Sequence, residues 1–460
     1  MWRRMLKWVL GVILVVVLGA AAWIATKGKD VLRVATGSVS RSLCSAVFVS
    51  RVDPDRLYAE EQKPRLGLLD WAMRYSIDRD RHEVRAAVAG AFAARAVYRE
   101  GLGCLVVHGD DVPEAAGIEA PAFADAFADR SAVVEPADPA LRKALDGAFA
   151  EPDPKDPRNT KALVVLHDGR LIAERYAPGY GPNTPIWAHS LSKSLTNALI
   201  GILVRERKLG VGEPAPLAAW QGSADPHRMI TVDQLLRMSS GLPFDDNDDA
   251  LNHLTRMIFL ERDMAAYAAK VPLEHRPGKA WGYSNAGYMV LSRLVRDAVG
   301  KSAADVERFA RRELFEPLGM RTAQLDCDAT GTPIGASNSY ASARDWARFG
   351  QLYLDDGVVA GRRILPETWV AYSRAQTLDT GYGAGFWTNL VDHGSVPVWN
   401  APWGMPQLPK DMFYARGALG QYIVIVPSER LVVVRMGIGY GGVESAIAQI
   451  IAALHAQANQ

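Results

Sequence analysis

The sequence predicts an α+β fold, an α/β sandwich in which one antiparallel sheet is flanked by helices and joined to an all-helical lobe. Two observations support this prediction. Strand-like apolar runs occur at residues 162–176 and again at 421–436, and the long segment between them has mainly helical periodicity. Strands at both ends of a domain with helices between them are typical of α+β folds. The 460 residues, 49% hydrophobic and 22% charged, suffice for a large core and a second unit.

The predicted sheet begins with a hairpin and is followed by a helix. Residues 162–166 and 171–176 flank an Asp-Gly pair, which is a strong hairpin signal. A helix should begin at Ser190 and end near Gly210, because glycine suits a helix C-cap. Further helices are expected in the lobe at residues 232–238, 261–270, 286–299 and 342–354. The last elements are strands at 421–426 and 431–436 and an amphipathic helix at 442–456.

The region before this domain divides into three parts. We assign residues 1–29 to a membrane segment, 30–135 to an added subdomain and 136–160 to a linker, with the main domain at 161–460. Three prolines between residues 151 and 158 interrupt any regular element there. Residues 83–99 are alanine-rich enough for a helix but also alternate like a strand, and the sequence leaves both readings open.

The first residues indicate export and a membrane anchor. Arg3, Arg4 and Lys7 precede an uncharged apolar run from Trp8 to Ala25, which is long enough to span a bilayer. The basic side is expected to remain in the cytoplasm, so a signal-anchor transmembrane helix would place the catalytic domain on the periplasmic side. Cleavage at the alanines after residue 19 would instead yield a secreted protein.

The three cysteines fit an oxidising compartment. None belongs to a Cys-x-x-Cys pair, which argues against zinc-ribbon and thioredoxin-like sites. Cys44 and Cys104 are predicted to form a disulfide, and Cys327 to be a buried free thiol. The alternative is that all three are buried free thiols.

Charge and motif content argue against several other classes of function. The chain has 52 basic and 51 acidic residues, a net charge of +1, and no basic patch interleaved with aromatic residues. We therefore expect no nucleic-acid partner. No metalloprotease, phosphate-loop or dinucleotide motif occurs, so we expect neither a metal nor a cofactor.

One short motif points to nucleophilic catalysis. Ser190 and Lys193 are three residues apart at the start of an apolar helix, so they share one helix face. A serine hydroxyl needs a base within hydrogen-bond reach to act as a nucleophile, and a lysine one turn away can be that base. The motif predicts Ser190 as the nucleophile and Lys193 as the general base. For this motif alone, a solvated helix face is the alternative.

A second motif, Tyr283-Ser284-Asn285, follows 93 residues after Ser190, on a loop just before a predicted helix. A tyrosine close to Lys193 could act as general acid and base, carrying a proton between nucleophile and leaving group. Asn285 could position the lysine or a substrate carbonyl. Only Ser190 among the serines has a lysine three residues on, and only Tyr283 among the tyrosines has an asparagine two residues on.

With these motifs the chain resembles the serine β-lactamase and penicillin-binding-protein superfamily, nearest to class C β-lactamase-like esterases and 6-aminohexanoate-dimer hydrolases. Residues 231–242, 342–350 and 420–427 are also similar to segments of that family. The resemblance covers residues 150–458 and implies a β-lactamase-like fold and an acyl-enzyme on Ser190. It further implies an oxyanion hole made by the backbone N–H of Ser190 and one on a late strand.

The third motif of the family is missing, since no Lys-Thr-Gly, Lys-Ser-Gly or His-Thr-Gly occurs. A gap-free count puts residues 412–415 in its place. Ala415 is then the predicted oxyanion donor, because any non-proline residue has an N–H. Arg416 is a candidate to hold a substrate carboxylate, and the alternative is that it only faces solvent.

The departure in the third motif favours an amidase or esterase acting on a small, less anionic molecule. A β-lactamase or D-Ala-D-Ala peptidase, and a catalytically weak cell-envelope binding protein, remain alternatives. Trp187, Tyr382 and Trp387 are candidate walls of the substrate pocket. His189 is expected to be a packed residue, because the neighbour of a helical residue points elsewhere.

Overall fold

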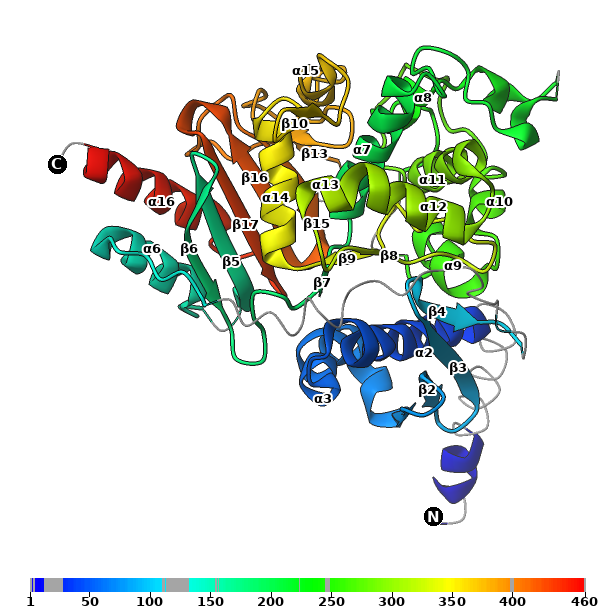
Figure 1. Ribbon diagram of the computed structural model, residues 1–460. Helices are drawn as coiled ribbons and strands as arrows, with labels where there is room; N and C mark the ends of the chain where they lie inside the picture. The colour runs from blue at the N-terminus through cyan, green and yellow to red at the C-terminus, as the bar shows by residue number, and fades with distance from the viewer. Residues whose placement is uncertain are drawn as a thin grey trace.

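The computed structural model describes residues 2, 5–11, 28–109, 112, 132–153, 155, 157–222, 224–244, 249–397 and 401–458. Figure 1 shows a smaller N-terminal group of elements beside a larger group that contains the main sheet and the helical lobe. We call residues 28–109 the N-terminal subdomain and residues 132–458 the main domain.

In the N-terminal subdomain one helix packs on a four-stranded antiparallel sheet. Helix α2 (Lys29–Cys44) contacts all four strands, which pair in the order β1-β2-β3-β4. The strands are β1 (Met73–Asp78), β2 (Glu83–Val88), β3 (Phe92–Arg99) and β4 (Gly103–Val107). Short helical segments join α2 to the sheet: η2 (Ser45–Ser50), α3 (Pro54–Leu57), η3 (Tyr58–Gln62), α4 (Lys63–Leu66) and η4 (Gly67–Ala72).

Residues 83–99, which the sequence left open, form the hairpin of β2 and β3. Val84, Ala86 and Val88 are buried at alternate positions, as a strand on an apolar helix requires. The chain turns between the strands at Gly90, whose φ of 72° suits glycine.

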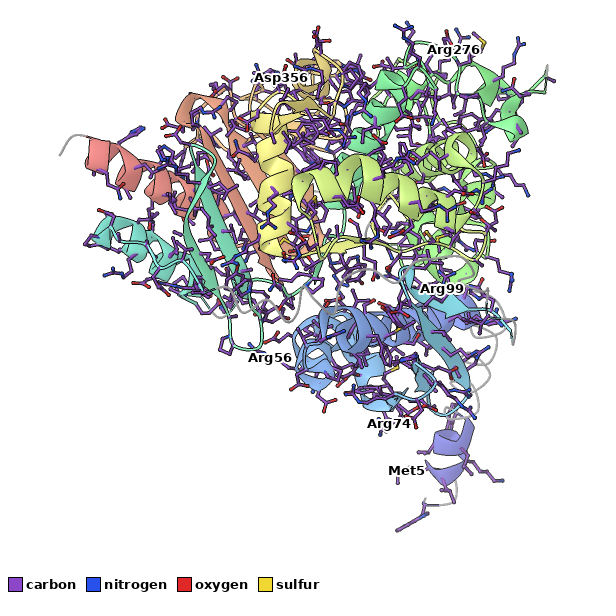
Figure 2. The ribbon with its side chains drawn as sticks, in the orientation of Figure 1. Met5, Arg56, Arg74, Arg99, Arg276 and Asp356 are labelled. Carbon is purple, nitrogen blue, oxygen red and sulfur yellow. A yellow bond between two sulfur atoms is a disulfide. The ribbon has the colours of Figure 1, made fainter. Side chains whose placement is uncertain are left out.

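The cysteine predictions are confirmed. Cys44, at the end of α2, is bonded to Cys104 on β4 across 60 residues. Cys327 of the main domain is a buried free thiol, and burial raises its pKa to about 12. Arg99 of the subdomain donates to the Cys327 carbonyl oxygen, and Figure 2 labels Arg99 at this junction.

The predicted antiparallel sheet is confirmed. Six strands pair in the order β12-β15-β16-β17-β5-β6, and strands from the two ends of the domain meet where β17 pairs with β5. Their bounds are β5 (Thr160–His167), β6 (Arg170–Tyr176), β12 (Trp387–Thr388), β15 (Phe413–Gly417), β16 (Gln421–Val426) and β17 (Leu431–Gly437). In Figure 1, α6 (Pro139–Phe149) and α16 (Val443–Ala458) lie on one side of the sheet and α14 (Ala343–Leu354) on the other.

The other elements form the helical lobe and the edges of the sheet. The helices are α7 (Leu191–Arg205), α8 (Val232–Leu236), α9 (His253–Leu260), α10 (Met264–Ala268), α11 (Asn285–Val299), α12 (Ala303–Ala310), α13 (Glu316–Leu318) and α15 (Trp369–Arg374). Short helical turns are η5 (Ala218–Trp220), η6 (Pro226–Met229), η7 (Arg311–Phe315), η8 (Ala418–Gly420) and η9 (Pro427–Glu429). The minor strands are β7 (Ile186–Trp187), β8 (Gln324–Leu325), β9 (Ser339–Ala341), β10 (Val358–Val359), β11 (Arg362–Arg363), β13 (Ser395–Val396) and β14 (Ala401–Pro402).

Two predicted helix boundaries are wrong, and the segment assigned to a linker contains a helix. Helix α7 ends at Arg205, because the chain takes a left-handed turn at Arg207 (φ 58°) well before Gly210. The helix expected at 261–270 begins only after Asp263, whose side chain accepts from the Ala266 N–H and caps α10. The predicted linker contains α6, an amphipathic helix that packs with α16.

The predicted membrane segment cannot be located in the structure. Among the residues that the structure describes, no helix is long and apolar enough to cross a membrane. Residues 12–25 of the predicted apolar anchor lie outside the described residues.

Candidate active site

Ser190, Lys193 and Asn285 form one hydrogen-bonded group. Ser190 is half-buried at the N-terminal end of α7, and Lys193, in the first turn of that helix, is 1% exposed. Lys193 Nζ donates to Ser190 Oγ at 3.1 Å and to Asn285 Oδ1 at 2.6 Å. Lys193 Nζ also donates to the Ala336 carbonyl oxygen at 2.5 Å. The structure thus joins residues from both sequence motifs around one amine.

Tyr283 completes this group. Its ring centroid lies 4.8 Å from Lys193 Nζ, a cation–π distance. The tyrosine is on the loop before α11, and Asn285 is the first residue of that helix. Tyr283 is 6% exposed, so its phenol lies in a largely dry environment beside the lysine. The arrangement can move a proton among a hydroxyl, an amine and a phenol.

The turn that presents Ser190 is strained and firmly held. His189 has a φ of 48°, which is uncommon for a residue other than glycine. Its carbonyl oxygen accepts from Ser192 Oγ at 2.7 Å and from the Ser192 N–H at 3.1 Å. Just upstream, the Ala188 N–H donates to the Ser339 carbonyl oxygen at 2.9 Å. We call residues 188–190 the nucleophile turn.

Strand β15 meets the nucleophile turn at Gly417. A Cβ atom at this position would lie 2.4 Å from the Ala188 carbonyl oxygen and 3.2 Å from His189 Cβ. Only glycine therefore allows this close approach. Ala415, the predicted oxyanion donor, is buried on the same strand, two residues before the contact, and pairs with Ile423 of β16.

Arg416 lies among aromatic rings beside the site. Its guanidinium carbon is 5.9 Å from the ring centroid of Trp387 and 5.7 Å from that of Tyr440. Tyr283 is also among the groups that act electrostatically on this arginine.

Comparisons with known proteins identify the family of the chain. The family model described as Beta-lactamase matches residues 147–457. The chain belongs to the beta-lactamase family. A 6-aminohexanoate-dimer hydrolase of Paenarthrobacter ureafaciens is 26% identical over 244 residues, which cover 49% of this chain and 61% of that protein. Penicillin-binding protein 4* of Bacillus subtilis is 28% identical over 178 residues, covering 35% of this chain and 37% of that protein. Each match spans less than two thirds of the relative.

Among solved structures, a putative 6-aminohexanoate-dimer hydrolase from Bacillus anthracis has the same fold as this member of the beta-lactamase family. The TM-score is 0.54 at 23% sequence identity, and the match covers 69% of this chain and 82% of the other. A class C beta lactamase from Rhodobacter sphaeroides has a TM-score of 0.50 at 18% identity, covering 70% of this chain and 99% of the other. The resemblance inferred from the sequence motifs is confirmed at the level of family and fold.

The predicted pocket residues fall into two places in this beta-lactamase-family domain. Tyr382 and Trp387 are nearly fully buried and pack around Tyr283, together with Trp281 and Trp403. These rings support Tyr283 from behind and do not form the open wall of a substrate pocket that was expected from the sequence. Trp187 lies apart from this cluster and is half-buried. Its ring stacks on the His189 ring, with 3.8 Å between the ring centroids.

His189 is a packed residue, as expected. It is 7% exposed, and burial, with Arg65, Arg41 and Lys193 nearby, holds its pKa well below the usual range. The imidazole is thus neutral near pH 7. Within the described ranges, no three histidine, cysteine or carboxylate side chains gather closely enough to hold a metal ion.

Sequence reasoning missed the segment 336–339, which holds the site from behind. The Ala336 carbonyl oxygen accepts from Lys193, and the Ser337 carbonyl oxygen accepts from Trp187 Nε1 at 2.8 Å. The Ser339 N–H donates to Ser192 Oγ at 3.0 Å. Backbone groups make most of these contacts, so no residue type in the sequence could have revealed them.

Proposed function

We propose that this protein is an extracytoplasmic serine hydrolase that cleaves amide or ester bonds through an acyl-enzyme on Ser190. The observation that carries the proposal is the 3.1 Å contact between Lys193 Nζ and Ser190 Oγ. Asn285 and the Ala336 carbonyl fix the amine at that distance, so the base is held ready before a substrate arrives.

The proposed mechanism assigns one step to each group. Lys193, in its neutral form, accepts the Ser190 proton while Oγ attacks the substrate carbonyl carbon. The Ser190 N–H and an N–H of β15, at or near Ala415, stabilise the oxyanion. Tyr283 then passes a proton to the departing amine or alcohol, which leaves an ester on Ser190. Water hydrolyses this ester by the same proton transfers in reverse order.

Mass spectrometry after reaction with a fluorophosphonate tests this proposal. We expect one added phosphonyl group on the peptide containing Ser190, lost in Ser190→Ala and kept in Ser428→Ala, which changes an exposed serine. An unlabelled Ser190 in folded protein, alongside a control hydrolase that reacts, would count against the acyl-enzyme.

The missing third motif by itself favours a less anionic substrate, but Arg416 leads us to propose a short amide or ester that carries a carboxylate. The relatives named as 6-aminohexanoate-dimer hydrolases support an amide substrate. Arg416, whose guanidinium lies near the rings of Trp387 and Tyr440, supports recognition of a negative group. Comparing the turnover of 6-aminohexanoate dimer with that of its methyl ester measures how much the substrate carboxylate contributes to recognition.

A β-lactamase or D-Ala-D-Ala peptidase is the second candidate, because Arg416 could hold the carboxylate of a β-lactam in the same way. Nitrocefin hydrolysis, or a stable penicilloyl adduct on Ser190, would favour it over the amidase. If neither reaction occurs and simple amides are turned over well, the amidase is favoured.

We also propose that the N-terminal apolar run anchors the enzyme in a membrane with its catalytic domain outside the cytoplasm. The uncharged stretch from Trp8 to Ala25 and the disulfide between Cys44 and Cys104 support this location. Resistance of the full chain to alkaline extraction, with the catalytic domain open to protease in spheroplasts, is the expected result. A chain released from the membrane fraction after signal cleavage would support the secreted alternative.

A further inference from the structure

One arginine of the N-terminal subdomain reaches the structure that supports the nucleophile turn. Arg41 of α2 is 2% exposed, and its guanidinium carbon lies 5.0 Å from the ring centroid of Trp187. The same indole ring stacks on His189, with ring planes 24° apart. Since His189 directly precedes Ser190, a continuous line of contacts leads from the added subdomain to the nucleophile.

Arg41 is itself held in a fixed place. It forms an ion pair with Asp326 of the main domain, and both side chains are buried. The Asn338 amide, with its oxygen turned toward the guanidinium, accepts from Arg41 Nε at 3.1 Å and from Nη1 at 2.8 Å. Asn338 lies in the segment 336–339, which also holds Trp187 and the nucleophile turn. Arg41 therefore contacts both the ring and the segment that supports the ring.

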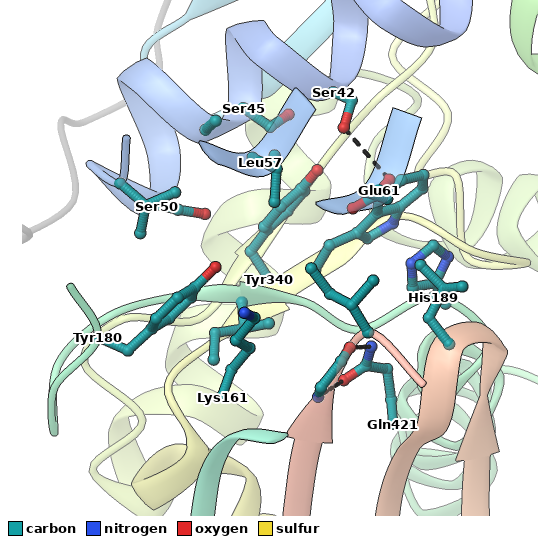
Figure 3. A pocket seen from close by; sticks show the side chains of 17 residues that line it. Ser42, Ser45, Ser50, Leu57, Glu61, Lys161, Tyr180, His189, Tyr340 and Gln421 are labelled. Carbon is teal, nitrogen blue, oxygen red and sulfur yellow. Dashed lines mark hydrogen bonds between the residues drawn. The ribbon is translucent and has the colours of Figure 1, made fainter. Parts of the chain in front are cut away.

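The nucleophile turn needs such support. A left-handed conformation is unfavourable for histidine and persists only where its surroundings enforce it. Figure 3 shows His189 and Tyr340 on the main-domain side of a cavity, facing Ser42 and Glu61 of the N-terminal subdomain. The cavity measures about 40 Å³, room for little more than a water molecule. The two domains thus pack closely behind the turn.

We propose that Arg41 is a positioning residue of the active site. Through the Trp187 ring it holds His189 in the conformation that presents Ser190 Oγ to Lys193. The inference rests on the proposed function of Ser190, and it makes the added subdomain a working part of the hydrolase.

The first test compares Arg41→Lys with a matched control, Glu60→Gln. Lysine keeps a charge for Asp326 but loses the flat guanidinium that faces the indole. Glu60 forms another ion pair across the same junction, with Lys161 Nζ at 2.6 Å, and also accepts from Arg56 of its own subdomain. We expect Arg41→Lys to slow fluorophosphonate labelling of Ser190 at least tenfold, and Glu60→Gln to change it less than twofold, both measured on folded protein.

A double-mutant cycle then separates positioning from general stability. If Arg41 acts through the ring, Arg41→Lys combined with Trp187→Leu should be labelled no more slowly than the slower single variant. The proposal would be overturned if the two substitutions slowed labelling by independent factors that multiply in the double variant. It would also be overturned if Arg41→Lys were labelled at the wild-type rate. If Arg41→Lys does not fold, the pair Arg41→Gln with Asp326→Asn, which removes both buried charges together, takes its place.

A second readout does not depend on catalysis. Fluorine NMR of protein containing 5-fluorotryptophan gives one signal for each tryptophan, and the Trp187 signal is the one absent from Trp187→Phe. We expect this signal to shift in Arg41→Lys and to stay in place in Glu60→Gln. An unmoved resonance overturns the inference whether or not Ser190 reacts. A shifted resonance in a protein whose wild-type Ser190 is never labelled would instead contradict only the proposed function.

Discussion

Replacing Lys193 by methionine tests the centre of the proposed site. Methionine is similar in length, but it lacks the Nζ that joins Ser190 Oγ, Asn285 Oδ1 and the Ala336 carbonyl. Loss of a positioned general base typically slows a reaction about 10²–10⁴-fold. At about 1.36 kcal/mol per tenfold, that loss is about 3–5 kcal/mol of transition-state stabilisation.

The same substitution has a cost in folding that the assay must separate from chemistry. Two buried acceptors, Asn285 Oδ1 and the Ala336 carbonyl, lose their donor, at about 1–3 kcal/mol each. Removal of a buried charge offsets part of this loss. Lys161→Met is the matched control, because Lys161 is also 1% exposed but donates to Glu60 and Asn159 instead of to the three acceptors of Lys193.

The assay is the second-order rate of fluorophosphonate labelling at Ser190, measured together with thermal unfolding of each variant. We expect Lys193→Met to be at least a hundredfold slower than wild type at a temperature where it is folded, and Lys161→Met to stay within threefold. Folded Lys193→Met that is labelled within threefold of wild type would refute the role of Lys193 as general base.

Three further predictions concern the disulfide, the close approach of β15 and the pH dependence of stability. Cys104→Ser, which opens the 60-residue loop closed by Cys44, should lower the free energy of unfolding by about 4 kcal/mol, and urea denaturation of variant and wild type measures this. Gly417→Ala should slow Ser190 labelling at least tenfold because its Cβ would collide with the nucleophile turn, whereas Gly181→Ala, with no atom within 4 Å of its Cβ, should leave labelling unchanged. Burial opposes the ionisation of Glu174, yet hydrogen bonds from its arginine, tyrosine and backbone partners hold its pKa below the usual value. The stability that Glu174 contributes is complete above about pH 4.3 and is lost as pH falls through the lowered pKa. The difference in free energy of unfolding between wild type and Glu174→Gln, measured by urea denaturation, should therefore shrink on acidification. A difference that stays constant from pH 7 to 3 would contradict this reasoning.

Much of the fold could be predicted because its pattern is local. Strand β16 occupies the predicted residues 421–426, since every residue in it is buried and the run ends at a proline. The end of α7 could not be predicted, because Arg207 adopts a left-handed conformation without being glycine or asparagine. Helix α6 was missed for a different reason. Its apolar face is short and becomes stable by packing against α16, almost 300 residues later in the chain.

The active site divides in the same way. Spacing alone placed Lys193 beside Ser190, because three residues on a helix make neighbours. The contact from Lys193 to the Ala336 carbonyl spans 143 residues and uses a backbone atom, so it has no signature in the sequence. Trp187 was recognised as an aromatic residue near the nucleophile, but its role depends on the added subdomain, for which the family pattern offered no guide.

The missing third motif changes what the strand at the site can recognise more than what it can catalyse. An oxyanion donor on β15 requires only that the backbone come close to the nucleophile turn, and Gly417 allows this approach at the Ala188 carbonyl. Lysine or threonine side chains are not needed for that geometry. Substrate binding, in contrast, depends on side chains, and here the strand carries Arg416 among Trp387, Tyr440 and Tyr283. The proposed acyl transfer and the proposed substrate recognition can therefore diverge on this strand, because the first depends on the backbone and the second on side chains.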